Sequence, residues 1–413
     1  MSRASPASQS LSHDAAIELA RRAPPGEVLV AGAGIGGLAA ALALSRRGIP
    51  VHVLERREAF AEEGAGIQIG PNGTRILAEL GVAGLLQPHA GEPEGLRVMD
   101  AVRGREITRL PLGRWLAARH GAPYWTAHRA DLHAALVARV RNDPRIRLSM
   151  GFEAGVVDSG RESVVVDTGG AGRLKGAALI AADGIRSGIR TSLISAALPL
   201  PAGKSAARTV IPAESVPAGL SRNDTHIWLA PHAHVVHYPV RAGKEIAIVA
   251  VFDDGEASED WNAPVLPGWV MHRVAQFQEP LHALLAAPKS WRKWSLYTAP
   301  RIPRWVAGRV ALLGDAAHPV LPFLAQGAVL ALEDAVVLAR CLAAPGVSVE
   351  DGLAAYERLR RGRARQVALA SARNGRRYHL EGITATLRNQ VLSTIPAERL
   401  MASYDWLYGW RAE

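Results

Sequence analysis

The stretch that decides the fold is "EVLVAGAGIGGLAAALALSRRGIPVHVLER", residues 27–56. Residues 28–30 predict a short apolar strand, the Ala/Leu-rich run to about residue 47 predicts a helix, and "VHVLE" predicts a second strand. A G-x-G-x-x-G turn joins the first strand to the helix, and an acid, Glu55, ends the second strand 18 residues after the last glycine of the turn. This order and spacing predict a βαβ unit that binds a dinucleotide.

Each part of this unit has a physical role. Gly32 permits the tight turn, Gly34 lets the backbone approach a pyrophosphate, and Gly37 allows close packing of helix on sheet. The helix N-terminus presents unpaired N–H groups to the phosphates, and Glu55 can accept hydrogen bonds from an unphosphorylated ribose. We assign Gly36 and Arg56 to the same site. Glycines also occur in ordinary loops, and this unit alone does not distinguish NAD from FAD.

Composition limits the classes of protein that fit. The 413 residues suffice for two or three domains, and 48% of them are hydrophobic. No apolar run approaches the roughly 18 residues of a membrane helix, and residues 1–25 predict a flexible extension without a secretory signal. The single cysteine, Cys341, lies in an apolar run and predicts a core position. A cytoplasmic protein that does not bind membranes is therefore expected.

The net charge of +10 comes from arginines scattered along the chain. Nucleic-acid binding would require a basic face together with a known binding module, and the sequence contains no such module. We therefore predict no nucleic-acid partner. The charge favours anionic small molecules instead, because it raises the local positive potential.

Two later segments also place an acid directly after an apolar strand. In "ALIAADGIRSGIR", residues 178–190, the strand meets Asp183; in "GRVALLGDAAHPVLPFLAQGAVLALEDA", residues 308–335, it meets Asp315. A loop with Pro319 and Pro322 follows Asp315, and a helix is predicted to begin near Gly327. Asp315 could be a simple helix N-cap, but the predicted helix begins about ten residues later.

With "GAGIQIGPNGTRIL" (64–77) and "HRADLHAAL" (128–136), these motifs make the chain similar to the single-component FAD-dependent aromatic hydroxylases. The resemblance covers about residues 27–375 and is greatest to the branch with salicylate hydroxylase, 3-hydroxybenzoate 6-hydroxylase and 6-hydroxynicotinate 3-monooxygenase. It implies an α/β fold: a discontinuous Rossmann-like FAD-binding domain, an α+β substrate domain built mainly on an antiparallel sheet, and C-terminal helices. The expected FAD-binding domain comprises 26–100, 129–190 and 300–375. The substrate domain comprises 101–128 and 191–299, and a helical segment spans 376–413, which we expect to pack on the body or on a second subunit of a homodimer.

The same resemblance implies how the cofactor is held. Asp315 would bond the ribityl chain of the flavin, and the helix that begins at Gly327 and Ala328 would point its N–H groups at the pyrimidine edge. The resemblance also implies contacts with FAD at Arg129, Gln68 and Asp183. NADH would visit transiently as the reductant.

The implied reaction is hydroxylation of a hydroxylated aromatic acid with dioxygen, through a flavin hydroperoxide. The predicted strand near residues 235–240 alternates, so His234 and Tyr238 share a face, and they match a substrate-pocket pair of the family. We predict both as catalytic, although such a strand could also be ordinary sheet surface. Pro322 and Phe323 are predicted to line the substrate pocket, and Phe323 favours a benzenoid ring over a nicotinate.

Three residues are weaker candidates for holding the substrate carboxylate: Arg75, His128 and Arg208. No metal site is expected, because the chain has no H-x-x-x-H or C-x-x-C motif. Two alternatives stay open. One is another flavoenzyme on the same scaffold, such as a halogenase or a reductase. The other is a non-catalytic FAD-fold binding protein, which would be expected to lack the Gly314-Asp315 motif or its proline loop.

Overall fold

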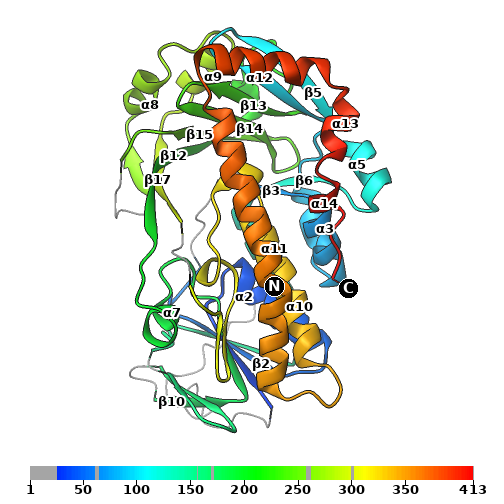
Figure 1. Cartoon of the computed structure of the whole chain (residues 1–413), viewed down its shortest axis with the longest axis vertical. Coiled ribbons are helices and arrows are strands. Elements are labelled where there is room, and N and C mark those ends of the chain that lie inside the picture. Colours follow the sequence, from blue (N-terminus) through cyan, green and yellow to red (C-terminus); the bar gives the residue numbers. More distant parts are fainter. Residues whose placement is uncertain are drawn as a thin grey trace, which may run out of the picture.

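The structure is a computed structural model that describes residues 26–60, 65–155, 157–168, 172–256, 262–298 and 302–412. The predicted extension, residues 1–25, lies outside the described residues. Figure 1 shows two large sheets toward opposite ends of the long axis, with the long helix α11 (Val349–Tyr378) running between them. No helix within the described ranges combines the length and apolar character needed to cross a bilayer.

The first sheet is the predicted dinucleotide-binding sheet. It has six strands, in the spatial order β18 (Val306–Ala307), β19 (Val310–Leu312), β11 (Ala178–Ala181), β1 (Val28–Ala31), β2 (Val51–Glu55) and β7 (Ile146–Met150). All neighbours pair in parallel except β18 and β19. Because parallel strands end at the same edge, the turns after β1, β11 and β19 meet there. These turns carry the glycine motif, Asp183 and Asp315.

Helix α2 (Ile35–Arg46) is apolar almost all round because it is covered on both sides. One side packs on the sheet and the other on α10 (Gly327–Leu342). Gly36 makes the second contact possible, since a Cβ at that position would lie 2.9 Å from Leu313 Cδ2 and 3.2 Å from Ala331 Cβ. Helix α6 (Arg129–Arg141) also packs against α2.

The second sheet is mainly antiparallel, as predicted for the substrate domain. Its eight strands follow the order β16 (Ala263–Val265), β17 (Trp291–Thr298), β12 (Leu200–Pro212), β15 (Glu245–Phe252), β14 (Ala233–Val240), β13 (Thr225–Ala230), β4 (Gly95–Asp100) and β5 (Arg105–Pro111). Only β13 and β4 pair in parallel. The expected domain boundary after residue 100 would separate β4 from β5, yet these two strands pair in one sheet. The segment 95–100 therefore groups with the second sheet.

The remaining elements are small. They are the three-stranded sheet β8 (Val157–Ser159), β9 (Val164–Asp167) and β10 (Arg173–Gly176), the pair β3 (Gly66–Ile69) and β6 (Trp125–His128), and the helices α3 (Pro71–Glu79), α4 (Ala83–Leu86), α5 (Gly113–His120), α7 (Gly188–Leu193), α8 (Pro267–Arg273), α9 (Leu281–Ala286), α12 (Gly382–Thr394), α13 (Ala397–Ala402) and α14 (Asp405–Tyr408). Of the C-terminal helices, α12 lies across the top of the view in Figure 1, and α13 and α14 follow it down the right side. The predicted fold class is confirmed.

A buried ionic network joins α10 to α11 beneath the 314–326 loop. Asp334 accepts hydrogen bonds from the Gly314 backbone N–H at 3.1 Å and from Arg360 Nε at 2.7 Å, and it also pairs with His318. Glu333, next to it, pairs with Arg360 at 2.9 Å and with Arg363. These groups are almost completely buried, so each charge depends on its partners for the solvation that water would otherwise supply.

Replacing Arg360 with alanine should destabilise the protein strongly. It would leave two buried carboxylates short of a cation, which costs about 3–5 kcal/mol when a buried pair is broken. The exposed neighbour Arg358 provides a matched control, because R358A removes the same side chain from the surface of the same helix and should change stability by about 0.5 kcal/mol or less. Urea unfolding followed by tryptophan fluorescence measures both; equal midpoints for the two variants would contradict the role of the network.

Candidate active site

Two connected cavities lie where the turns of the first sheet face the second sheet. The first has a volume of about 630 Å³ and the second about 340 Å³. Four residues line both: Gly34, Arg129, Ala182 and Gly184. The two cavities therefore form one elongated site, with the glycine turn and the start of α6 at its middle.

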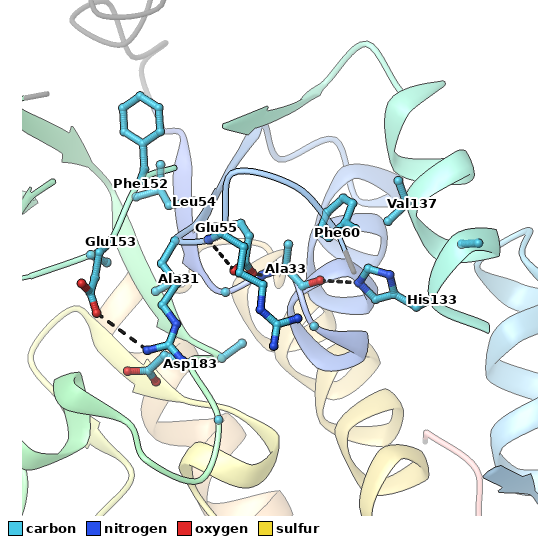
Figure 2. Close-up of a pocket in the computed structure, with 18 of the residues that line it drawn as sticks. Ala31, Ala33, Leu54, Glu55, Phe60, His133, Val137, Phe152, Glu153 and Asp183 are labelled. Atoms are coloured by element: carbon cyan, nitrogen blue, oxygen red, sulfur yellow. Dashed lines mark hydrogen bonds and ion pairs between the residues drawn. The ribbon is translucent and has the colours of Figure 1, made fainter. Parts of the chain in front are cut away.

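The first cavity surrounds the tip of β2, and Figure 2 shows its lining. The Glu55 carboxylate accepts hydrogen bonds from the backbone N–H of Ala33 at 2.8 Å and of Arg57 at 3.0 Å, which orients it beside the glycine turn. Arg56 is largely exposed and lies 3.9 Å from Glu153, and both residues line this cavity. The arrangement suits the ribose end of a dinucleotide, since oriented carboxylate oxygens accept hydrogen bonds from hydroxyl groups.

The glycine turn has the geometry that its sequence predicted. Gly32 has φ +100°, and a Cβ there would lie 2.6 Å from the Ala182 carbonyl oxygen. A Cβ at Gly37 would lie 1.9 Å from the Gly32 carbonyl oxygen, so helix α2 reaches the sheet only because this residue has no side chain. A Cβ at Gly34 would meet no described atom within 4 Å and would occupy open space in the site. Open space beside the backbone is what a phosphate group needs in order to approach it.

Asp183 lines the first cavity with part of its hydrogen-bonding capacity unused. Its Oδ2 accepts a hydrogen bond from the Ile189 N–H at 3.3 Å, whereas its buried Oδ1 has no hydrogen-bond partner among the described residues. Burial raises the pKa of this carboxyl, although Ser187 and nearby donors oppose the change. A buried oxygen in this condition is suited to accept a hydrogen bond from a ligand.

Arg190, seven residues later, is fully buried and joins two of the motifs. Its guanidinium donates to the Ala316 carbonyl at 3.0 Å and to the Ile185 carbonyl at 2.7 Å. The segment that carries Asp183 is thereby fastened to the segment that carries Asp315. Burial lowers the pKa of Arg190, with Asp183 opposing that effect.

One wall of the second cavity comes from the 314–328 segment and the start of α10. It includes Asp315, Pro322, Gly327 and Ala328, each predicted as a contact. The Asp315 side chain is accessible from the cavity, while the surrounding protein raises its pKa by desolvation, partly offset by His318 and Arg129. The first N–H groups of α10 lack helical partners, so the positive end of its dipole lies at this wall.

The opposite wall is one face of the second sheet. Cα partners in register across β12, β15 and β14 place Arg208, Val249 and Val236 in one row. The flanking rows contain His234 with Val251, and Tyr238 with Ala247. Because alternate residues share a face, His234 and Tyr238 both line the cavity, as predicted, and Arg208 lies in the row between them. His237 points to the opposite face, where its ring stacks on His226 with centroids 4.3 Å apart.

Tyr238 is 3% exposed, and burial raises its pKa, so its hydroxyl stays protonated and can donate a hydrogen bond. Its ring packs against Gly66 of β3, where a Cβ would lie 2.4 Å from Tyr238 Cε2. Gln68, two residues later, also lines the cavity, and its Oε1 accepts a hydrogen bond from the Tyr124 hydroxyl at 2.6 Å. This hydrogen bond fixes the position of the Gln68 side chain in the cavity that Tyr238 also lines.

The structure separates the three candidates for carboxylate binding. Arg75 donates to the Trp410 and His120 carbonyls, both at 2.7 Å, and so fastens the C-terminal segment. His128 caps α6, where its Nδ1 accepts from the Ala130 N–H at 3.3 Å. Of the three, Arg208 alone lines the second cavity.

Arg208 is half-buried, and its Nε is buried without a hydrogen-bond partner in the described chain. Its guanidinium carbon lies 4.9 Å from the centroid of the Trp294 ring. Burial lowers its pKa and Tyr238 opposes that shift. A guanidinium whose Nε has no partner in the described chain, next to a tyrosine, is suited to bind a carboxylate. The sequence did contain a signal for this residue: Arg208 is the single charged residue in the otherwise mostly apolar stretch "SAARTVIP", which marks it as a stronger candidate for carboxylate binding.

Phe323 lies behind the wall rather than in it. Its ring is 5% exposed, contacts His234 edge-to-face with centroids 5.4 Å apart, and fits against Gly375, where a Cβ would lie 2.5 Å from two ring carbons. Phe323 therefore supports the histidine, and its identity does not shape the cavity surface directly. His379, which no motif indicated, bonds His234 at 2.8 Å.

These features fit an extended flavin dinucleotide. The site offers a phosphate approach at Gly34, a carboxylate at each of Glu55, Asp183 and Asp315, and a helix N-terminus at the far wall. These residues come from the glycine turn with Glu55, the Asp183 segment and the Asp315 segment, which the parallel strands bring to one edge of the sheet.

Comparison with known proteins gives the same assignment. A model of the FAD binding domain family matches residues 26–371. The chain is 36% identical over 386 residues to 3-hydroxybenzoate 6-hydroxylase of Polaromonas naphthalenivorans (strain CJ2), covering 93% of this chain and 96% of that protein. It is 35% identical to 3-amino-4-hydroxybenzoate 2-monooxygenase PtmB3 of Streptomyces platensis over 387 residues, covering 93% and 96% of the two chains.

Solved structures agree with these matches. A salicylate hydroxylase substrate complex has a TM-score of 0.80 at 28% identity, covering 94% of this chain and 96% of that chain. Klebsiella pneumoniae HpxO complexed with FAD and uric acid has a TM-score of 0.80 at 24% identity, covering 92% and 95%, and shows the shared fold. The resemblance predicted from the motifs is confirmed.

Substitution G34A should weaken FAD binding without harming the fold. Gly34 has φ −74°, so alanine fits the backbone, but its methyl group would stand where the phosphates approach. We expect the Kd for FAD to rise about tenfold or more, roughly 1.4 kcal/mol. Substitution G84A at an exposed position of helix α4, where a Cβ also meets no described atom, is the control and should leave the Kd unchanged. Titration of the apoprotein with FAD measures both; equal affinities would show that Gly34 does not face the cofactor.

Proposed function

Because the chain belongs to the family of FAD-dependent aromatic hydroxylases, we propose that it uses NADH and dioxygen to hydroxylate a benzenoid ring that carries a hydroxyl group and a carboxylate. Its sequence relatives include hydroxylases named for 3-hydroxybenzoate and 3-amino-4-hydroxybenzoate. Both compounds combine a ring, a hydroxyl group and a carboxylate, and this combination is the one the cavity can recognise.

A single observation supports this proposal most strongly. The cavity of about 340 Å³ has the predicted flavin contacts on one wall and His234, Tyr238 and Arg208 on the other. Ligand sites of this kind are apolar with a few converging polar groups. Here Val236, Val249 and Val251 supply apolar surface from the same sheet face.

Each polar group has a distinct task in the proposed reaction. Tyr238, neutral at physiological pH, donates a hydrogen bond to a substrate oxygen. His234 accepts the phenolic proton at Nε2, because its Nδ1 already bonds His379. Removing this proton makes the ring electron-rich and ready for an electrophilic oxygen. Arg208 binds the carboxylate and thereby orients the ring.

Bound FAD would supply the redox chemistry, in which electrons from NADH activate dioxygen. The remaining work of the protein is to exclude water and hold the ring. Val236, Val249 and Val251 exclude water, and the rigid proline loop helps to hold the ring.

Steady-state assays test the proposal directly. The FAD-loaded protein is mixed with NADH and each of a panel of hydroxybenzoates and hydroxynicotinates, while NADH oxidation, hydrogen peroxide and aromatic products are quantified. We expect at least one hydroxybenzoate to give a hydroxylated product with little peroxide. Peroxide without hydroxylated product for every member of the panel would contradict the proposed substrate class.

Substitution R208M tests the carboxylate contact. Methionine keeps the apolar stem but removes the charge, so the KM for the hydroxybenzoate should rise about 10- to 100-fold, as expected for losing a hydrogen bond of roughly 1.5–3 kcal/mol to a charged group. The matched comparison is the corresponding hydroxybenzamide, which has no carboxylate and should show nearly the same KM with both enzymes. An equal rise in KM for acid and amide would place Arg208 in a purely structural role.

A further inference from the structure

Resting on the proposed function, we propose that His379 carries the phenolic proton from His234 outward to Asp253 and solvent. His379 acts through His234 and does not touch the substrate. It follows α11, whereas His234 lies in β14 and Asp253 directly follows β15. Three segments far apart in sequence thus contribute to one path that leads from the second cavity to the surface.

The first link of the path is a direct hydrogen bond. His234 Nδ1 and His379 Nε2 are 2.8 Å apart, and both rings are buried. The rings of Phe323 and Tyr378, with centroids 5.4 Å and 5.3 Å from that of His234, hold its orientation. Since Nδ1 is engaged, Nε2 is the ring nitrogen of His234 that serves the cavity.

The second link leads to the surface. His379 Nδ1 is buried without a hydrogen-bond partner in the described residues, and Asp253 Oδ2 lies 3.8 Å away. This separation is slightly beyond hydrogen-bond distance, so the link requires a bridging water or a small rotation of the Asp253 side chain. Side-chain exposure increases along the path, from 5% for His379 to 38% for Asp253. A proton that reaches Asp253 can therefore pass to water.

Burial explains why His234 requires such an outlet. Desolvation, followed by the influence of His379 and Lys204, lowers the pKa of His234 well below the ordinary histidine value. Desolvation, together with Lys204, also lowers the pKa of His379, to about 4, although Asp253 opposes the shift. Both shifts disfavour an extra proton on either ring, so a proton accepted on one side is expected to leave from the other.

The transfer is balanced at every atom. The phenol gives its proton to His234 Nε2 while His234 Nδ1–H passes to His379 Nε2 and His379 Nδ1–H passes to Asp253 and water. The substrate becomes a phenolate, one proton enters solvent, and both histidines are neutral in the opposite tautomer. When the product hydroxyl regains a proton along the same path, both tautomers are restored.

Several charged groups face this pair from neighbouring elements. Lys204 of β12 forms an ion pair with Asp253, and the exposed His232 pairs with Glu381 at 3.1 Å. The ion pair with Lys204 holds the Asp253 carboxylate near His379. The side chain of His232 is 64% exposed and bonds Glu381 rather than a side chain of the path, so it offers a control histidine in the same region.

Substitution H379Q tests the path. The glutamine oxygen can accept a hydrogen bond from His234 but cannot pass the proton on. We expect phenolate formation, followed by stopped-flow absorbance of the bound substrate, to slow about a hundredfold at pH 7, with unchanged FAD content and substrate Kd. The rate should recover as pH rises, because the phenol then loses its proton to hydroxide, and a merely structural residue would not produce this recovery.

The control H232Q should react like the wild type at every pH. D253N should slow the reaction in the same pH-dependent manner, though less, because water can replace the terminal acceptor. If H379Q fails to retain FAD, H379N and D253N decide by the same criterion. If the His379 variant that retains FAD shows wild-type rates and a wild-type pH profile, the relay is overturned and the proposed function is not affected. If the wild-type enzyme hydroxylates no hydroxybenzoate, the proposed function itself is contradicted.

Discussion

Backbone packing on backbone at the glycine turn is the constraint on which the rest of the site depends. Because Gly37 approaches the Gly32 carbonyl more closely than any side chain would allow, helix α2 begins directly above the end of β1. Its N–H groups and the Gly34 backbone then face the middle of the elongated site. From that middle, one cavity extends toward Glu55 and the other toward the second sheet. A side chain at Gly32 or Gly37 would therefore displace the lining of both cavities.

A second constraint is electrostatic and lies beneath the far end of the site. Asp334 and Glu333 are buried with Arg360 and Arg363, and Asp334 also accepts a hydrogen bond from the backbone of Gly314. Because Asp315 follows Gly314 directly, the position of the predicted flavin contact is set by charges on α10 and α11. Arg190 performs a similar task for Asp183 by bonding the Ala316 carbonyl. The segments that carry Asp183 and Asp315 are thus positioned by arginines that lie behind the site.

Burial then determines the protonation of the groups on the substrate side. Desolvation keeps the Tyr238 hydroxyl protonated and the His234 ring neutral, so the two residues are a donor and an acceptor in the same wall. The same burial leaves an Arg208 nitrogen without a partner in the described chain. An apolar cavity with these three groups is suited to a ring with polar substituents at more than one position, and the low dielectric strengthens each contact.

The sequence by itself determined the βαβ unit, the three motif turns and the alternation that places His234 with Tyr238. These features depend on residues close in the chain, where spacing, glycine and strand periodicity impose the geometry. Only the tertiary structure decided that β4 lies in the second sheet, that Arg208 lines the second cavity while Arg75 and His128 do not, and that Phe323 lies behind the wall. Each depends on strand pairing or packing between distant segments, such as the contact of His234 with His379, 145 residues apart. Local pattern constrains which way a side chain points along its own element, but long-range packing decides what it meets.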